Sequence, residues 1–256
     1  MNKPALSVIC PSINPEKWDN IYRGLQKSSF DNLFELVCVG PNPPPAELFV
    51  VHNFRYLREL SQPSRSFQLG VSVSEGKYIA FIPDDIILDE GGFDKCISLL
   101  DKKPSNHGVI LRYSEGGNNQ DQDPKYWIGK THSDQQLLGI DEVWNIAPCF
   151  MYNREYFMSI GGLDCSMEHV NLNGHSIAYF TQANGGQMWP SPTRIFSAGW
   201  QPPTESTILY QAYLQNDAPK FTEFWNRADA AKEYKINFDN WRNQPAVWNR
   251  RYERNC

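Results

Sequence analysis

The sequence predicts an α/β fold with a mostly parallel central sheet flanked by helices, and a C-terminal helical extension. Between residues 6 and 113, short continuous apolar runs alternate with stretches that carry apolar residues at helical spacing. Continuous apolar runs are typical of strands that helices bury on both faces. This alternation of strand and helix predicts a mostly parallel sheet with right-handed crossovers. In such a sheet, ligands bind beyond the carboxyl ends of the strands.

The first half of the chain supplies four of the expected strands. They are predicted at residues 6–10, 35–39, 48–52 and 78–82. The first strand ends at Pro11, which has no N–H to donate to a sheet. Helices are predicted between them and after them, at residues 15–28, 65–75 and 91–101.

The second half is less regular. Residues 108–113 and 143–152 are expected as strands, and residues 153–160 as a helix that ends at a glycine pair. The polar stretch 114–136 predicts a long loop, and such loops are often functional. From about residue 204 the pattern is helical, so we expect a catalytic domain at 1–200 and a helical extension at 201–256.

Composition excludes several classes of protein. The chain has 256 residues, a formal net charge of −5 and no long basic run, which argues against a nucleic-acid partner. No stretch reaches the roughly 18 apolar residues that span a bilayer, and no secretory signal is evident. We therefore expect a cytoplasmic protein, or one peripheral to a membrane. The six cysteines form no CxxC pair and are expected as buried thiols.

Two adjacent carboxylates form the strongest local signal. Asp84 and Asp85 follow the apolar run 78–82 directly, with no basic residue nearby in sequence to pair them. Like charges repel, and a hard divalent cation such as Mn²⁺ or Mg²⁺ would relieve that repulsion while binding phosphates. The competing interpretation is an ordinary acidic turn, in which Asp85 or Asp89 caps the following helix.

The order of motifs resembles that of the GT-A fold glycosyltransferases, above all the large inverting family that includes cellulose, chitin and hyaluronan synthases. Four segments carry the resemblance, which covers roughly residues 5–200. They are SVICPSIN at 7–14, RSFQLGVSVSEGKYIAFIPDD at 65–85, IGGLD at 160–164 and EHVNL at 168–172.

The resemblance implies roles for particular residues. It implies that Asp85 binds the metal, that Asp84 lies near the ribose or sugar, and that Glu168 or His169 takes the acceptor's proton, with a slight preference for Glu168. A neutral histidine and a partly desolvated carboxylate are both competent bases near neutral pH. The remaining candidates are the donor-binding residues Pro11, Ser12, Asn14 and Arg65, and the acceptor or sugar residues Trp144, Gly161, Gly162 and Asp164.

The function implied is transfer of a sugar from a UDP- or GDP-sugar to a glycan or lipid-linked acceptor. Departures from the family pattern keep an alternative open. Pro83 replaces the first Asp of Asp-x-Asp, Gly40-Pro41-Asn42 replaces the Asp that often holds the base, and His169 falls on the catalytic Asp. The alternative is an inactive nucleotide-sugar or glycan-binding module. A dehydrogenase is disfavoured because no GxGxxG follows the first strand.

Overall fold

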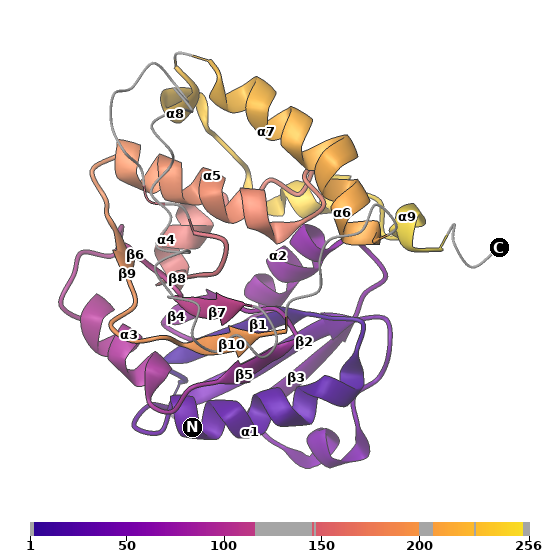
Figure 1. The fold of residues 1–256 in the computed structure, drawn as a ribbon, viewed down its shortest axis with the longest axis vertical. Coiled ribbons are helices and arrows are strands. Elements are labelled where there is room, and N and C mark those ends of the chain that lie inside the picture. Colours follow the sequence, from indigo (N-terminus) through magenta and orange to yellow (C-terminus); the bar gives the residue numbers. More distant parts are fainter. Residues whose placement is uncertain (1–2, 116–144, 146, 200–206, 228, 253–256) are drawn as a thin grey trace.

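The protein is described by a computed structural model that covers residues 3–115, 145, 147–199, 207–227 and 229–252. Its centre is a seven-stranded sheet in the order β3-β2-β1-β4-β8-β6-β9 (Figure 1). The strands are β1 (Leu6–Pro11), β2 (Phe34–Gly40), β3 (Phe54–Arg58), β4 (Tyr78–Phe81), β6 (Gly108–Ile110), β8 (Phe150–Asn153) and β9 (Met188–Pro190). Strands β1 to β4 are parallel, and β8 runs antiparallel to both of its neighbours. The predicted fold class is therefore confirmed.

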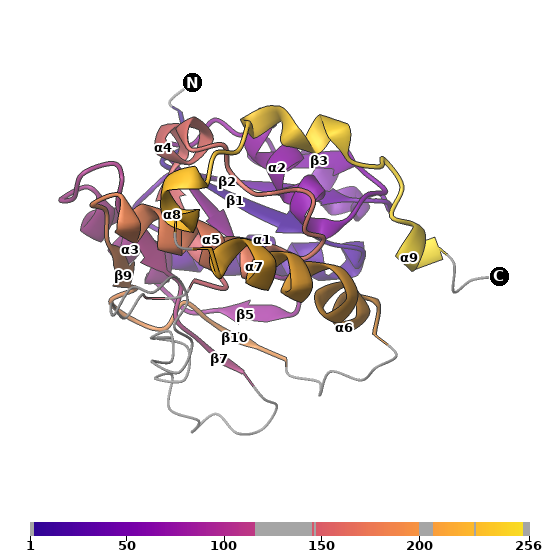
Figure 2. The same ribbon diagram turned by 90° about the horizontal axis from the view of Figure 1, so that it is seen from above.

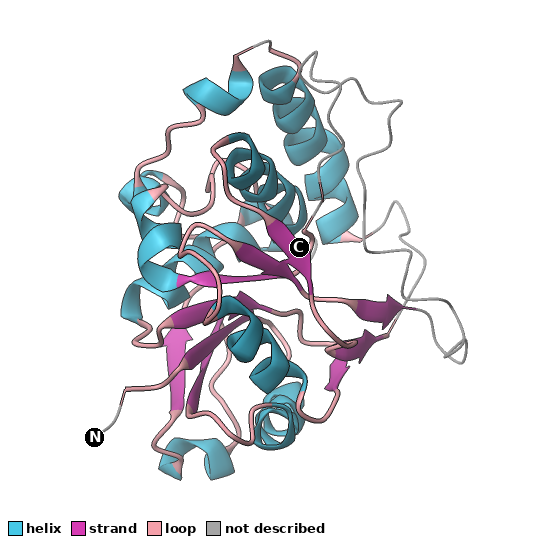
Figure 3. Cartoon of the chain, turned by 90° about the vertical axis from the view of Figure 1, so that its left-hand side faces the viewer, coloured by secondary structure: helices cyan, strands magenta, loops and turns pink. Residues whose placement is uncertain are grey.

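Helices cover both faces of this sheet (Figures 1 and 3). On one side lie α1 (Trp18–Ser28) and α3 (Gly92–Leu100), and on the other α2 (Pro63–Val73), α4 (Arg154–Ser159) and α5 (Val170–Ala183). The apolar face of α1 buries Trp18, Ile21 and Leu25 against the sheet, which is the spacing seen in the sequence. A second, three-stranded sheet joins β5 (Ile86–Leu88), β10 (Phe196–Ala198) and β7 (Tyr113–Glu115).

One predicted strand is wrong. Residues 48–52 are not extended, because Pro45 leads into a 3-10 helix at Ala46–Val50, of which only Leu48 is buried. Phe49 and Val50 are 65% and 87% exposed. The strand that pairs with β2 is instead β3, a half-exposed edge strand whose mixed sequence lacks a continuous apolar run.

The C-terminal part packs on α5 and returns to the first half of the chain (Figure 2). It contains α6 (Ile208–Ala212), a π-helical turn (Tyr213–Asp217), α7 (Ala218–Trp225), α8 (Ala230–Glu233), a 3-10 helix (Phe238–Asn243) and α9 (Asn249–Tyr252). Phe221 and Trp225 pack against Tyr179 of α5, and Tyr234 stacks on Trp225, in a second apolar core. The predicted domain boundary at 200/201 lies outside the described residues and stays a prediction.

Two sequence expectations concern the whole chain. Of the six cysteines, Cys10, Cys38, Cys96, Cys149 and Cys165 are free and buried, as expected. Within the described residues, no helix is both long enough and apolar enough to cross a membrane.

Candidate functional site

A cavity of about 700 Å³ lies at the carboxyl ends of β1, β2 and β4, where parallel strands of an α/β sheet place their ligands. One wall is formed by residues 11–14, after β1, and residues 83–85, after β4. The facing wall contains the start of α5, the start of α6 and the segment around α9. The two groups of residues that the sequence placed at strand ends therefore line a single cavity.

Asp84 connects the two strand ends. Its Oδ2 accepts hydrogen bonds from Ser12 Oγ at 2.6 Å and from Asn14 Nδ2 at 2.8 Å. Lys17, at the end of the turn before α1, places its Nζ 3.6 Å from Asp84 Oδ1. Ser12 Oγ also accepts the N–H of Asn14. These contacts fix the loop after β1, so the residues predicted to face a donor are held in one arrangement.

Asp85 differs from Asp84 because, in the described part of the chain, its carboxylate has no side-chain partner. It lines the cavity, and its backbone carbonyl accepts the N–H of Gly199 at 2.9 Å. Desolvation, and then the charge of Asp84, raise the pKa of Asp85. Both causes disfavour a bare carboxylate, and a cation would relieve both.

The described residues around Asp85 would form an incomplete site for a divalent metal, which a bound ligand would have to complete. Among the described residues, no group of three or more His, Cys, Asp or Glu side chains could hold an ion. Mg²⁺-type ions are commonly held by one or two carboxylates together with substrate phosphates and water. Asp85 suits that arrangement as one such carboxylate.

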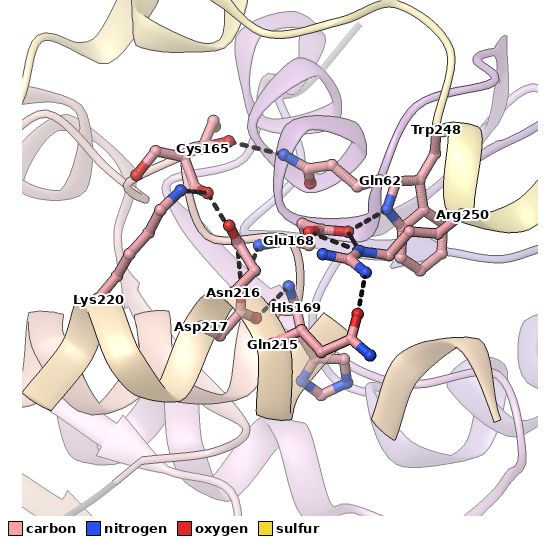
Figure 4. Close-up of polar contacts among 11 residues, drawn as sticks. Gln62, Cys165, Glu168, His169, Gln215, Asn216, Asp217, Lys220, Trp248 and Arg250 are labelled. Atoms are coloured by element: carbon pink, nitrogen blue, oxygen red, sulfur yellow. Dashed lines mark hydrogen bonds and ion pairs between the residues drawn. The ribbon is translucent and has the colours of Figure 1, made fainter. Parts of the chain in front are cut away.

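Glu168 is engaged in a polar cluster rather than free to act as a base (Figure 4). Arg250 Nε donates to both carboxylate oxygens of Glu168, at 2.9 and 2.8 Å, and the indole N–H of Trp248 donates to Oε2. Arg250 also donates to Gln215 Oε1 at 2.7 Å. The Glu168 side chain is 14% exposed and does not line the cavity.

His169 lines the cavity and caps α5. Its Nδ1 accepts the N–H of Asn171 at 3.2 Å, and burial lowers its pKa to about 4. The ring is therefore neutral near pH 7, and the proton lies on Nε2 because Nδ1 is already an acceptor. In this geometry His169 offers a hydrogen-bond donor to the cavity.

Asp217 holds the backbone of this loop in place. Its two carboxylate oxygens accept the N–H groups of Glu168 and His169, each at 2.7 Å. The side chain is completely buried, and desolvation raises its pKa. No sequence pattern indicates this role, because the aspartate lies 48 residues beyond the loop that it binds.

Other sequence candidates lie away from the cavity. Arg65 donates to Gln244 O at 2.9 Å, lies 3.7 Å from Glu59 and stacks on Trp241, so it is not presented to a diphosphate. Trp144 lies outside the described residues.

The glycine pair and Asp164 shape the loop after α4. Gly161 and Gly162 have φ of +94° and +67° and pack tightly against Ile236 and Gln68. Asp164 accepts the N–H of Ser166 at 2.9 Å. These three residues form a turn and do not line the cavity.

The structure also adds residues that the sequence did not single out. Lys17, Trp248 and Arg251 line the cavity. Trp248 and Arg251 come from the far end of the chain, where the only signal was a tryptophan followed by two arginines in a polar tail.

Comparisons with known proteins agree with this architecture. Residues 50–161 match the sequence model of the family described as glycosyl transferase family 2. The fold is similar to that of TarS 1–349 from S. aureus, with 16% identity and a TM-score of 0.54, over 76% of this chain and 60% of that one. No curated protein sequence matches the chain.

Two further solved structures share the fold. The mannosyltransferase PcManGT from Pyrobaculum calidifontis, in complex with GDP-Man and Mn²⁺, is 14% identical with a TM-score of 0.57, over 91% of this chain and 70% of that one. GalNAc-T7, with UDP, GalNAc and Mn²⁺, is 14% identical with a TM-score of 0.61, over 100% of this chain and 55% of that one. These similarities show that the chain has the GT-A fold, as the motif order predicted.

Proposed function

We propose that the protein transfers a sugar from a UDP- or GDP-sugar to a hydroxyl of a glycan or lipid-linked acceptor, with inversion and with a divalent metal. The observation that carries the proposal is the cavity at the strand ends. There the Asp85 carboxylate, which has no side-chain partner among the described residues, lies beside the network of Ser12, Asn14 and Asp84. TarS has been solved with UDP-GlcNAc, and PcManGT with GDP-Man and Mn²⁺. Glycan biosynthesis in the cytoplasm, or at a membrane surface, is part of the same proposal.

The donor would lie along the wall formed by the strand ends. Residues 11–14 and Asp84 would face its nucleoside and sugar, since they form the rigid wall beside Asp85. A Mn²⁺ or Mg²⁺ ion on Asp85 would neutralise charge on the diphosphate. Lys17 would contribute a further positive charge next to Asp84.

In the transfer, the acceptor oxygen attacks the anomeric carbon, and the bond from that carbon to the phosphate oxygen breaks. The nucleoside diphosphate leaves with the electron pair, and the acceptor's proton passes to a base. Of the two bases considered, His169 lines the cavity and Glu168 does not. We therefore place His169 beside the acceptor hydroxyl. Accepting a proton requires a ring nitrogen to become free, for example by release of Asn171 from Nδ1.

The test is calorimetric titration of UDP and GDP, with and without Mn²⁺. The wild type is compared with Asp85→Asn and with Asp31→Asn, an exposed aspartate outside the cavity. We expect one nucleotide to bind with Mn²⁺, and Asp85→Asn to weaken that binding by about tenfold or more, since a metal-bound carboxylate is lost. Asp31→Asn should bind like the wild type. Absence of binding for every nucleotide would contradict the proposal.

A second candidate function has its own support. The pairing of Glu168 with Arg250, together with the protonated Nε2 of His169, leaves neither residue poised as a base in this conformation. This favours a nucleotide-sugar-binding module without catalysis. Release of free sugar, or its transfer to an acceptor, by the purified protein would exclude that function.

A further inference from the structure

Two neighbouring arginines of α9 have different surroundings. Arg250 is paired with Glu168 and Gln215. Arg251 lines the cavity half-buried, and its guanidinium makes no hydrogen bond or ion pair with any described residue. The guanidinium carbon lies 5.8 Å from the centre of the Tyr252 ring. A partly desolvated cation without a counter-charge is unfavourable, so this arrangement favours binding of an anion.

The other charges of the cavity do not supply that anion. Asp84 is neutralised by Lys17 and bound by two donors. Glu59 accepts the N–H groups of Leu60 and Ser61 and lies near Arg65. Asp85, the remaining carboxylate of the lining, forms no ion pair with Arg251 either. Within the described residues, the counter-charge for Arg251 is therefore left to a ligand.

The position of Arg251 is fixed by contacts of the residues that precede it in sequence. Trp248 donates its backbone N–H to Leu60 O at 3.0 Å, and Val247 forms a parallel bridge with Leu60. The Trp248 indole and Arg250 both bind Glu168 (Figure 4). The segment 247–251 is thus attached to the loop before α2 and to the loop before α5.

We propose that Arg251 binds the diphosphate of the nucleotide-sugar donor, and that Glu168 is a positioning residue that anchors Arg251 through Arg250 and Trp248. The proposal rests on the proposed function, because it assumes a diphosphate in the cavity. The guanidinium group matches phosphate oxygens in geometry and charge, and it stays protonated throughout the physiological range. It would stabilise the negative charge that develops on the departing diphosphate, from the wall that faces the strand ends.

The first experiment separates the diphosphate from the nucleoside. Calorimetry with Mn²⁺ measures binding of UDP, GDP, uridine and guanosine to the wild type, Arg251→Gln, Arg251→Lys and Arg23→Gln. Arg23 is a matched control, since it is 70% exposed on α1. We expect Arg251→Gln to weaken binding of the nucleoside diphosphate by about tenfold or more, because a charge-assisted phosphate contact is lost. Its affinity for the nucleoside should stay within about twofold of the wild type, because the nucleoside has no phosphate. Arg251→Lys should recover part of the loss.

The second experiment tests the anchor. Glu168→Gln should weaken binding of the nucleoside diphosphate when Arg251 is present. It should have no further effect on that binding in the Arg251→Gln variant. A residue that merely stabilised the fold would weaken binding equally in both backgrounds. Thermal melts of each variant establish that the protein is folded at the titration temperature.

The outcomes are distinguishable. If the wild type binds a diphosphate and Arg251→Gln binds it equally well, the inference is overturned while the proposed function stands. If the wild type binds no nucleoside diphosphate, both are overturned. If Glu168→Gln has the same effect in both backgrounds, Glu168 is not the anchor.

Discussion

Acidification from pH 7 to pH 5 is expected to destabilise the protein through two histidines. Burial lowers the pKa of His169 and of His175 from 6.5 to about 4, with the charge of His169 adding to the effect on His175. Between pH 6.5 and pH 4, these two histidines are therefore mostly protonated in the unfolded chain and mostly neutral in the folded chain. Stability is fully present above pH 6.5 and is lost as the pH falls through this window.

The magnitude follows from the two pKa values. At pH 5, each histidine reduces the free energy of unfolding by about 2 kcal/mol relative to pH 7, so the pair contributes about 4 kcal/mol. Two carboxyl groups act in the opposite sense, because the pKa values of Asp85 and Asp217 are raised in the folded state. The histidine contribution is therefore best measured as a difference between variants.

The assay is urea unfolding at pH 7 and pH 5 for the wild type, His169→Asn, His175→Gln and the double variant. Each single replacement should reduce the pH-dependent loss by about 2 kcal/mol, whatever its own cost at pH 7. His52 is a suitable control for histidine replacement, since its side chain is exposed and does not line the cavity. An unchanged difference between pH 7 and pH 5 in the double variant would refute the reasoning.

Two further predictions concern stability and are checked by urea unfolding. Gly161→Ala should lower the free energy of unfolding by about 2–4 kcal/mol, because φ is +94° and a Cβ would lie 1.9 Å from Ile236 O. Gly91→Ala should lower it by only about 1 kcal/mol, because Gly91 has φ of +63° but open space around it. Equal costs at the two glycines would show that the close contact is unimportant. Asp217→Ala should cost about 2–4 kcal/mol, because two backbone N–H groups lose their acceptor. A cost below about 1 kcal/mol would show that water replaces the carboxylate.

The sequence predicted the centre of the fold well because that part depends on local pattern. Strands β1, β2 and β4 are continuous apolar runs buried on both faces, and each differs from its predicted range by one or two residues. Strand β3 was missed because an edge strand needs no such run. The apolar run at 48–52 was misinterpreted because periodicity cannot separate a strand from a short turn that buries one side chain.

The sequence predicted the part of the candidate site that lies at the ends of strands. It did not predict the part that is formed by contacts between residues far apart in the chain. Ser12, Asn14, Asp84 and Asp85 follow directly from the ends of β1 and β4. The partners of Glu168 lie 80 and 82 residues away, in a segment with no motif. Pairings at such separation depend on how the C-terminal part docks, and a sequence pattern does not encode that directly.

The attachment of segment 247–251 to the loop before α2 has a consequence for biosynthesis. Domains fold progressively as the chain emerges from the ribosome, and strands β1 to β4 come from residues 6–81. The cavity wall that carries Trp248 and Arg251 is synthesised long after the wall that it faces. A nascent chain could therefore hold most of a native sheet and still have an open, unfinished cavity, which is completed only after residues 247–251 have been synthesised.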